Sequence, residues 1–251
     1  MSVAFPGGTS VSELEVYSGV APDGLAGGTP HLHVASSEAY VVVGGRGRLQ
    51  TVDASGFAER ALEPGSVVWF SPGVVHRAVN DGGLAVRVIM QNAGLPEAGD
   101  AVMTFADDVL ADAEAYRAAA TLPGSEGSDA DRLAAALRRR DAAVAGFLDL
   151  RRAAEAGDPE PLARLHRRAA ALVAPRADAW TAIWHERIVA DVERTRARLA
   201  SLAAGDAEAV AAALADGRVA AGAPEPAFGM CGMLRRFPAA ADPTPTREDP
   251  S

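Results

Sequence analysis

Between residues 31 and 91 the apolar residues occur in short runs that are rich in β-branched and aromatic side chains. Such runs, separated by Gly, Pro, Asn, Asp and Ser, are typical of β-strands joined by turns. The predicted strands are the runs LHV, AYVVV, RLQTV, SVVWF, HRAV and LAVRVIM. An alternating run at residues 11–16 predicts an edge strand, and residues 80–83 (NDGG) predict a hairpin turn between the last two runs. Several short strands at this spacing favour a sandwich or a barrel.

Beyond about residue 98 the apolar residues recur every three to four positions, which is the period of an amphipathic helix. The predicted helices cover residues 129–154, 158–173 and 178–203, with further candidates at 104–120 and 206–217. The last stretch is rich in Pro and Ala and lacks this period, so we expect it to be mostly disordered.

These two patterns predict an α+β chain in which the strands come first. We expect an antiparallel β-barrel over residues 1–97, an all-helical region over 98–220 and a mostly disordered tail over 221–251. The apolar stripes of the helices must be buried against one another, against the barrel or against a second subunit. Trp180 and Trp184 lie four residues apart on one predicted helix and fit a subunit interface as well as a core, so we expect a homo-oligomer.

Composition and charge narrow the possible partners. The 251 residues carry a formal net charge of −9, and all 24 basic side chains are arginines. A chain of this sign repels polyanions, so no nucleic acid partner is expected. The sequence has no apolar run of membrane-spanning length and no signal-peptide pattern at its start, so we expect no membrane partner and a cytoplasmic location. Cys231 is the only cysteine, which excludes an intrachain disulfide and argues against thiolate metal sites.

Candidate chemistry is concentrated in the β-rich half, which holds three of the five histidines. His31 and His33 are separated by one residue, so on a strand both side chains point to the same face. Glu38 follows a predicted turn at residues 35–37 and opens the next strand, and His76 lies on a later one. Three imidazoles and a carboxylate suit a first-row divalent metal such as Fe, Mn, Zn or Ni, whereas unrelated structural histidines are the simpler alternative. Four protein ligands leave up to two open positions, which favours substrate or dioxygen coordination over a structural metal.

The spacing of these residues resembles the two sequence motifs of the cupin superfamily. Residues 31–45 read H-x-H-x4-E-x6-G, and residues 65–80 read G-x7-G-x2-H-x3-N. The resemblance covers roughly residues 10–95 and implies a small antiparallel barrel of the jelly-roll type. It also implies that His31, His33, Glu38 and His76 bind one divalent transition metal ion.

Other polar residues are candidates for contact with a substrate. Tyr40 shares the inward face of its strand with Glu38 and is a candidate catalytic residue, although a core tyrosine fits this position equally well. Two rows of polar side chains alternate along strands and would hold an anionic substrate if they faced inward. The rows consist of Arg46, Arg48 and Gln50, and of Arg87 and Gln91. We expect at least one of the rows to face solvent.

The expected function is that of a metal-dependent enzyme acting on a small molecule by oxygenase-type or isomerase-type chemistry. Glu38 would stay a metal ligand or act as a base. The alternative is a non-catalytic sensor or binding module whose helical region mediates oligomerisation or signalling.

Overall fold

The computed structural model describes residues 5–123, 128–207 and 225–237. The strands are β1 Ser10–Val16, β2 His31–His33, β3 Glu38–Asp53, β4 Gly56–Leu62, β5 Val67–Phe70, β6 Val75–Met90, β7 Ala101–Met103, β8 Ala227–Phe228 and β9 Gly232–Arg236. The helices are α1 Asp107–Ala111, α2 Ala113–Ala120, α3 Asp129–Glu155, α4 Glu160–Val173, α5 Ala177–Trp184 and α6 Ala190–Ala203. Short 3-10 turns occupy Pro6–Gly8 and Ala174–Arg176, and a π-helical turn at His185–Val189 joins α5 to α6.

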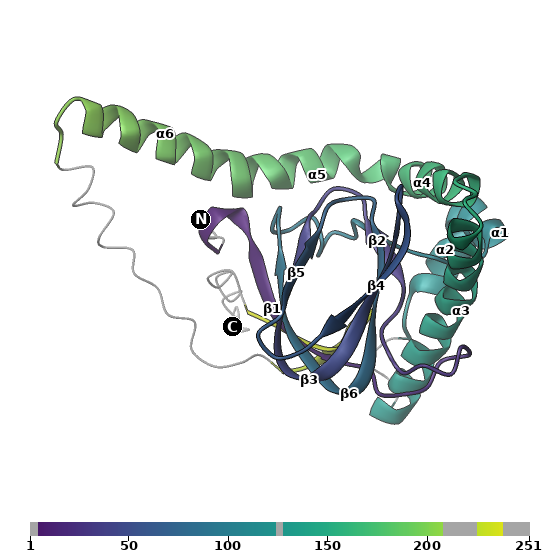
Figure 1. Ribbon diagram of the computed structural model, residues 1–251. Coiled ribbons are helices and arrows are strands. Elements are labelled where there is room, and N and C mark those ends of the chain that lie inside the picture. The colour runs from purple at the N-terminus through teal and green to yellow at the C-terminus, as the bar shows by residue number, and fades with distance from the viewer. Residues whose placement is uncertain (1–4, 124–127, 208–224, 238–251) are drawn as a thin grey trace, which may run out of the picture.

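Two long antiparallel strands, β3 and β6, form the frame of the barrel and pair with each other over most of their length (Figure 1). The second half of β3 and the first half of β6 are flanked by β4, β2 and β7. Their other halves are flanked by β5, β1, β9 and β8. The same two strands therefore belong to both sides of a folded-over, jelly-roll-like sheet, and no pairing closes this sheet into a full ring within the described residues.

A bend allows β3 and β6 to pass from one side of the sheet to the other. The pairing of the two strands shifts register between Val42 and Gly47. A β-carbon at Gly45 would lie 2.1 Å from the carbonyl oxygen of Gly83, and Gly45 has a positive φ of 67°, so glycine is required there. The hairpin predicted at residues 80–83 is therefore wrong. The chain does not reverse at these glycines but stays paired with β3, and the six predicted runs merge into fewer and longer strands.

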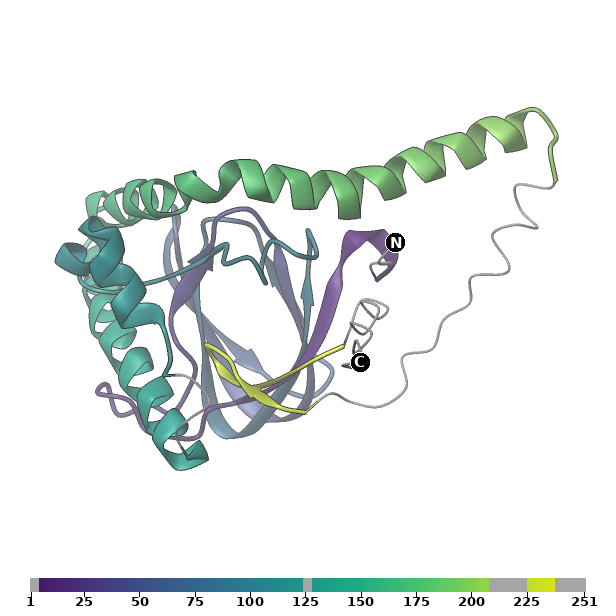
Figure 2. The same ribbon diagram turned by 180° about the vertical axis from the view of Figure 1, so that it is seen from behind.

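Helices cover the outer face of one side of the sheet (Figures 1 and 2). β2 is buried on both faces, because Leu32 packs among the helices while the flanking histidines point into the barrel. Phe147 of α3 and Leu165 of α4 belong to this same outer core. α3 lies so close to the barrel that a β-carbon at Gly146 would be 2.1 Å from the Thr104 carbonyl oxygen. A second core fills the barrel interior, where it includes Leu14, Val42 and Val86 among its residues.

The helix predictions are largely confirmed. Residues 129–154 form α3, which begins with a capping box between Ser128 and Asp131. The predicted helix at 158–173 corresponds to α4, and that at 178–203 corresponds to α5, the π-helical turn and α6. Residues 104–120 instead form two short helices, because the Asp112 side chain caps the second one by accepting hydrogen bonds from two backbone N–H groups. The candidate helix at 206–217 lies almost entirely outside the described residues. No helix in the described ranges is both long and apolar enough to cross a membrane.

Two predicted boundaries need correction. The barrel does not end at residue 97, because β7 pairs with β2 and extends the sheet to Met103. Part of the predicted disordered tail is ordered: β8 and β9 form a hairpin, and β9 pairs with β1. β1 is therefore an inner strand between β6 and β9, not an edge strand. The five-residue strand β9 is too short and too far along the chain for periodicity to reveal it. The rest of the predicted tail, 221–224 and 238–251, lies outside the described residues.

Candidate metal centre

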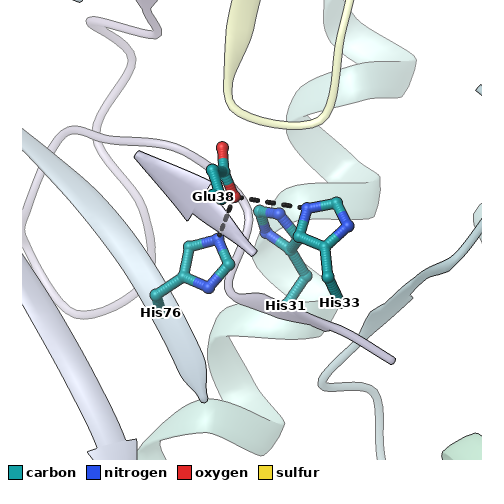
Figure 3. Close-up of side chains that lie close together, drawn as sticks. All are labelled: His31, His33, Glu38 and His76. Atoms are coloured by element: carbon teal, nitrogen blue, oxygen red, sulfur yellow. Dashed lines mark ion pairs between the residues drawn. The ribbon is translucent and has the colours of Figure 1, made fainter. Parts of the chain in front are cut away.

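The fold brings the four predicted ligands together inside the barrel. His31 and His33 come from β2, Glu38 is the first residue of β3, and His76 lies on β6 directly opposite His31 (Figure 3). One ligand atom of each residue lies within 4.8 Å of the corresponding atoms of the other three. All four residues are buried. The turn predicted at residues 35–37 is confirmed, and it lets Glu38 face the same space as the two histidines despite its odd offset from them.

Hydrogen bonds fix the orientation of all three imidazole rings. Nδ1 of His31 lies 2.8 Å from the Thr29 carbonyl oxygen, and Nδ1 of His76 lies 3.1 Å from the Val74 carbonyl oxygen. Nδ1 of His33 lies 2.6 Å from Oδ1 of Asp100. An Nδ1–H group that donates to an oxygen leaves Nε2 with a free lone pair in the neutral imidazole. Each ring is thus held in the tautomer that a metal ligand needs.

The atoms that face the centre lack well-formed hydrogen bonds. Oε2 of Glu38 lies 3.2 Å from Nε2 of His33 and 3.0 Å from Nε2 of His76. Within the described residues, neither Glu38 Oε2 nor His76 Nε2 makes a hydrogen bond of acceptable geometry. Burial of such polar atoms without partners is costly. A divalent ion between them would satisfy the carboxylate and the imidazole at once, so the donor set fits a first-row transition metal.

The electrostatics of the cluster agree with a site that requires a cation. Burial by itself raises the pKa of the Glu38 carboxyl, but the neighbouring His76 and His33 lower it overall, so the carboxylate stays ionised. Burial, reinforced by His76 and His33, lowers the pKa of His31 well below its usual value. Burial also acts to lower the pKa of His33, but the hydrogen bonds to Asp100 and Glu38 raise it to about 10. Without a metal, His33 therefore supplies the positive charge that the buried carboxylates need.

The residue that positions His33 was not identified from the sequence. Asp100 is completely buried, and one of its oxygens holds Nδ1 of His33. A carboxylate that hydrogen-bonds the far nitrogen of a metal-binding histidine orients the ring and increases its basicity. Asp100 was assigned to the helical region because it lies beyond residue 97. The available signal was its position one residue before the short apolar run AVM, which forms β7.

A cavity of about 130 Å³ leads to the cluster. Its inner end is formed by His31, His33, Glu38 and Tyr40, and its walls include residues of β1, β6 and the segment 229–237. Figure 3 shows the loop between β8 and β9 passing over the four side chains. In this loop Cys231 is buried, and its Sγ lies 3.9 Å from Nδ1 of His31. Burial, followed by the charge of Glu38, raises the pKa of Cys231 to about 12, so this residue remains a thiol.

Tyr40 belongs both to the barrel core and to the cavity wall. Its ring packs edge-on against Phe70, with 5.5 Å between the ring centroids, and lies 6.4 Å from the ring of His76. The side chain is fully buried, and its hydroxyl has no well-formed hydrogen bond within the described residues. Burial and the charge of Glu38 raise the pKa of Tyr40 well above its usual value. The hydroxyl is thus protonated and available to a molecule in the cavity.

The two rows of polar residues do not contribute to the cavity lining. Arg48 forms salt bridges with Asp81 and Glu59 on the barrel surface, and Gln50 donates a hydrogen bond to Glu59. Arg87 pairs with Glu13 of β1 and is mostly exposed. The expectation that at least one row faces away from the interior is confirmed.

Comparison with known proteins supports the fold and the position of the site. Residues 17–91 match a family model described as "Cupin domain", and this segment contains all four candidate ligands and Tyr40. A search of curated protein sequences finds no match.

Among solved structures, the barrel is similar to that of a protein with a double-stranded β-helix domain from Klebsiella pneumoniae, at 16% identity over 35% of this chain and 70% of the other, with a TM-score of 0.29. It is similar to Streptomyces Pac13, a nucleoside dehydratase, at 15% identity over 39% of this chain and 69% of that protein, with a TM-score of 0.30. It is also similar to KdgF from Halomonas sp., at 21% identity over 35% of this chain and 72% of that protein, with a TM-score of 0.27.

Proposed function

Because residues 17–91 form a cupin domain that carries all four candidate ligands, we propose that this protein is a metal-dependent enzyme acting on a small molecule. The observation that supports this proposal is the direction in which the cluster opens. His31, His33 and Glu38 line the cavity, so an ion that they held would be accessible to a small molecule bound there. A purely structural metal would need no such access.

His31, His33, Glu38 and His76 would hold the ion. A bound divalent ion would supply Lewis-acid polarisation of the substrate, or an oxygen-binding centre if it is iron. The surrounding residues prepare the site for this chemistry. Asp100 and the carbonyl oxygens of Thr29 and Val74 keep the imidazoles oriented.

Two side chains in this cavity can accept a proton or donate a hydrogen bond. Glu38 lines the cavity and remains ionised, and it would accept a proton from a substrate only after detaching from the ion. The Tyr40 hydroxyl is protonated and makes no well-formed hydrogen bond within the described residues, so it can donate a hydrogen bond to a substrate oxygen. Oxygenase-type and isomerase-type reactions both use these parts, and iron would favour the first type.

Elemental analysis of the purified protein, with the metal content expressed per chain, tests the proposal. We expect about one equivalent of a transition metal in the wild type and a loss of this metal in His33→Ala and His76→Ala. His166→Ala is the matched control, because His166 is exposed, hydrogen-bonds the Gly73 carbonyl oxygen and does not belong to the four-residue cluster. Iron would direct the next assay to oxygen consumption, and Mn, Zn or Ni would direct it to isomerisation. Unchanged metal content in both cluster variants would refute the ligand assignment.

The alternative, a binding module whose helical region mediates oligomerisation, is supported by one observation on α6. Val192, Leu199 and Leu202 are at least 50% exposed, and α6 has no buried residue. The seven-residue interval from Val192 to Leu199 matches the seam of a coiled coil. We therefore propose a second copy of α6 as the partner of this surface. A monomeric mass by light scattering would exclude such a dimer. A dimer without catalytic turnover would favour the binding module.

A further inference from the structure

The C-terminal strand β9 places a cationic side chain in the cavity. Neighbouring residues of a strand point to opposite faces, so Arg235 and Arg236 are directed to opposite sides of the sheet. Arg236 is a lining residue of the cavity, together with Ser12, its antiparallel neighbour on β1. Arg235 lies opposite Glu13, whose side chain pairs with Arg87 on the outer surface. Only the second of the two arginines therefore has access to the cavity.

The cavity lining gains polar residues along β1 and β9. Leu14 and Leu234 are paired neighbours on the inner part of the wall. Towards the end of β9 the lining includes the polar residues Ser10, Ser12 and Arg236 beside the apolar Val11 and Phe237. Besides the metal-site residues, Arg236 and Glu97 are the charged side chains of the lining. Glu97 is already engaged, because its Oε2 accepts a hydrogen bond from the backbone N–H of Gly94.

Arg236 forms no salt bridge within the described residues, a property that it shares with Arg46, Arg60 and Arg235 of the barrel strands. Arg48, Arg77 and Arg87 each form a salt bridge with a neighbouring carboxylate. Within residues 5–123, 128–207 and 225–237, no carboxylate oxygen lies within 4.0 Å of the Arg236 guanidinium. A guanidinium presents several N–H donors in a planar fork that matches a carboxylate. This exposed guanidinium at the open end of the cavity is therefore available to an anionic ligand.

We propose that Arg236 determines specificity by pairing with the carboxylate of a small organic acid, whose other polar end reaches the metal centre. This inference rests on the proposed function, since it assigns a substrate class to the same cavity. A volume of about 130 Å³ admits only a small molecule, in which a single carboxylate is a large part of the recognisable surface. The Ser10 and Ser12 hydroxyls, which line the same wall, are further donors for the anion.

The segment that carries this specificity lies outside the part of the chain that matches the cupin family. The loop preceding β9 is fixed to the barrel at both of its sides. The Thr29 hydroxyl donates to the Met230 carbonyl oxygen at 2.6 Å, and Tyr17 N donates to the Cys231 carbonyl oxygen at 3.0 Å. The Tyr17 hydroxyl and Arg139 both donate to the Gly229 carbonyl oxygen. These hydrogen bonds fix the loop to the barrel and hold β9 in register, so the fold determines the position of Arg236.

Calorimetric titration with pyruvate and with its neutral analogue pyruvamide tests the inference. The two probes share the carbonyl group that can reach a metal and differ in charge at one end. We expect the wild type to bind pyruvate more tightly than pyruvamide. We expect Arg236→Gln to weaken pyruvate binding about 10- to 100-fold and to leave pyruvamide binding unchanged. Arg235→Gln is the matched control and should bind both probes as the wild type does, because it removes an arginine of the same strand that lies on the other face.

The titrations are run on both metal-free and Mn²⁺-loaded protein, with the metal content of each variant measured in parallel. Failure of the wild type to take up metal would overturn the proposed function, and the metal-free titrations would still measure the role of Arg236. Equal binding of pyruvate and pyruvamide, no binding of pyruvate, or equal losses in the two arginine variants would overturn the inference. Inorganic phosphate is a third probe. If phosphate binds in an Arg236-dependent way and pyruvate does not, the site recognises a phosphate group, and the assignment of a carboxylate is refuted.

Discussion

Replacement of Asp100 tests whether the metal centre depends on its supporting carboxylate. Asp100 is completely buried, and its Oδ1 lies 2.6 Å from Nδ1 of His33. In Asp100→Asn the amide oxygen can still accept the imidazole hydrogen bond, so the ring keeps its orientation and loses only the negative charge beside it. The amide nitrogen would take the place of Oδ2, which has no hydrogen-bond partner within the described residues. The substitution therefore isolates the electrostatic contribution.

The expected effect is a loss of metal affinity. Substitution of a group that supports a metal-binding histidine typically lowers affinity by about 10- to 100-fold, or roughly 1.4–2.7 kcal/mol. Asp100→Ala should cost more, because it also leaves a buried Nδ1–H group without an acceptor, at about 1–3 kcal/mol. We thus expect the metal affinity to fall in the order wild type, Asp100→Asn, Asp100→Ala.

Competition of the protein with a fluorescent Zn²⁺ chelator measures this affinity, and thermal unfolding of the metal-free variants shows whether the fold is intact. Asp149→Asn is the matched control, since Asp149 lies on the exposed surface of α3 and pairs only with Arg152. Affinities within about threefold of the wild type in both Asp100 variants, well below the expected change, would refute the assigned role.

Two further predictions concern stability. Arg77 is fully buried and donates to both carboxylate oxygens of Asp23, so Asp23→Asn should destabilise the fold by about 3–5 kcal/mol at neutral pH, as measured by urea unfolding. Burial acts to raise the pKa of Asp23, but Arg77 lowers it overall, so the ion pair stabilises the fold above the usual Asp pKa. The difference in unfolding free energy between the wild type and Asp23→Asn should therefore shrink as pH falls through the lowered pKa. A difference that stays constant down to a pH of about 2 would contradict the assignment. Gly146→Ala should destabilise the protein by about 1–3 kcal/mol in thermal unfolding although alanine favours helices, because the new β-carbon would meet the Thr104 carbonyl oxygen at 2.1 Å. Ser201→Ala on α6 is the control, because it leaves the barrel untouched, whereas Gly157 has a positive φ of 74° and is unsuitable. A neutral or stabilising effect of Gly146→Ala would show that α3 can move away from the barrel.

The sequence was informative where local pattern determines structure. The cluster of candidate ligands, His31, His33, Glu38 and His76, was predicted because strand periodicity and motif spacing fix the directions of these side chains within a few residues of chain. The three long helical segments were identified from apolar periodicity and cap residues, which act within single turns. These features require no knowledge of which strand pairs with which.

The parts that were missed depend on pairing between distant segments. Asp100 functions only because β7 pairs with β2, and Arg236 lines the cavity only because β9 pairs with β1. Neither strand is longer than five residues, so neither has a periodicity of its own. The sequence also did not predict the bend at Gly45, where β3 stays paired with β6 near Gly83. Glycines allow both a chain reversal and a close approach of two backbones, so they do not by themselves distinguish a hairpin from a bend.

The pairing of β1 with β9 also sets the order in which the barrel can be completed during synthesis. Thr29 and Met230, which join the cavity wall to its covering loop, are 201 positions apart in the chain. Because the ribosome makes β1 first, the backbone groups of its β9-facing edge stay unpaired until almost all of the described chain has emerged. Open strand edges are templates for pairing with other chains. The nascent barrel thus passes through a stage in which the metal ligands are assembled but uncovered, and during this stage it depends most on protection from aggregation.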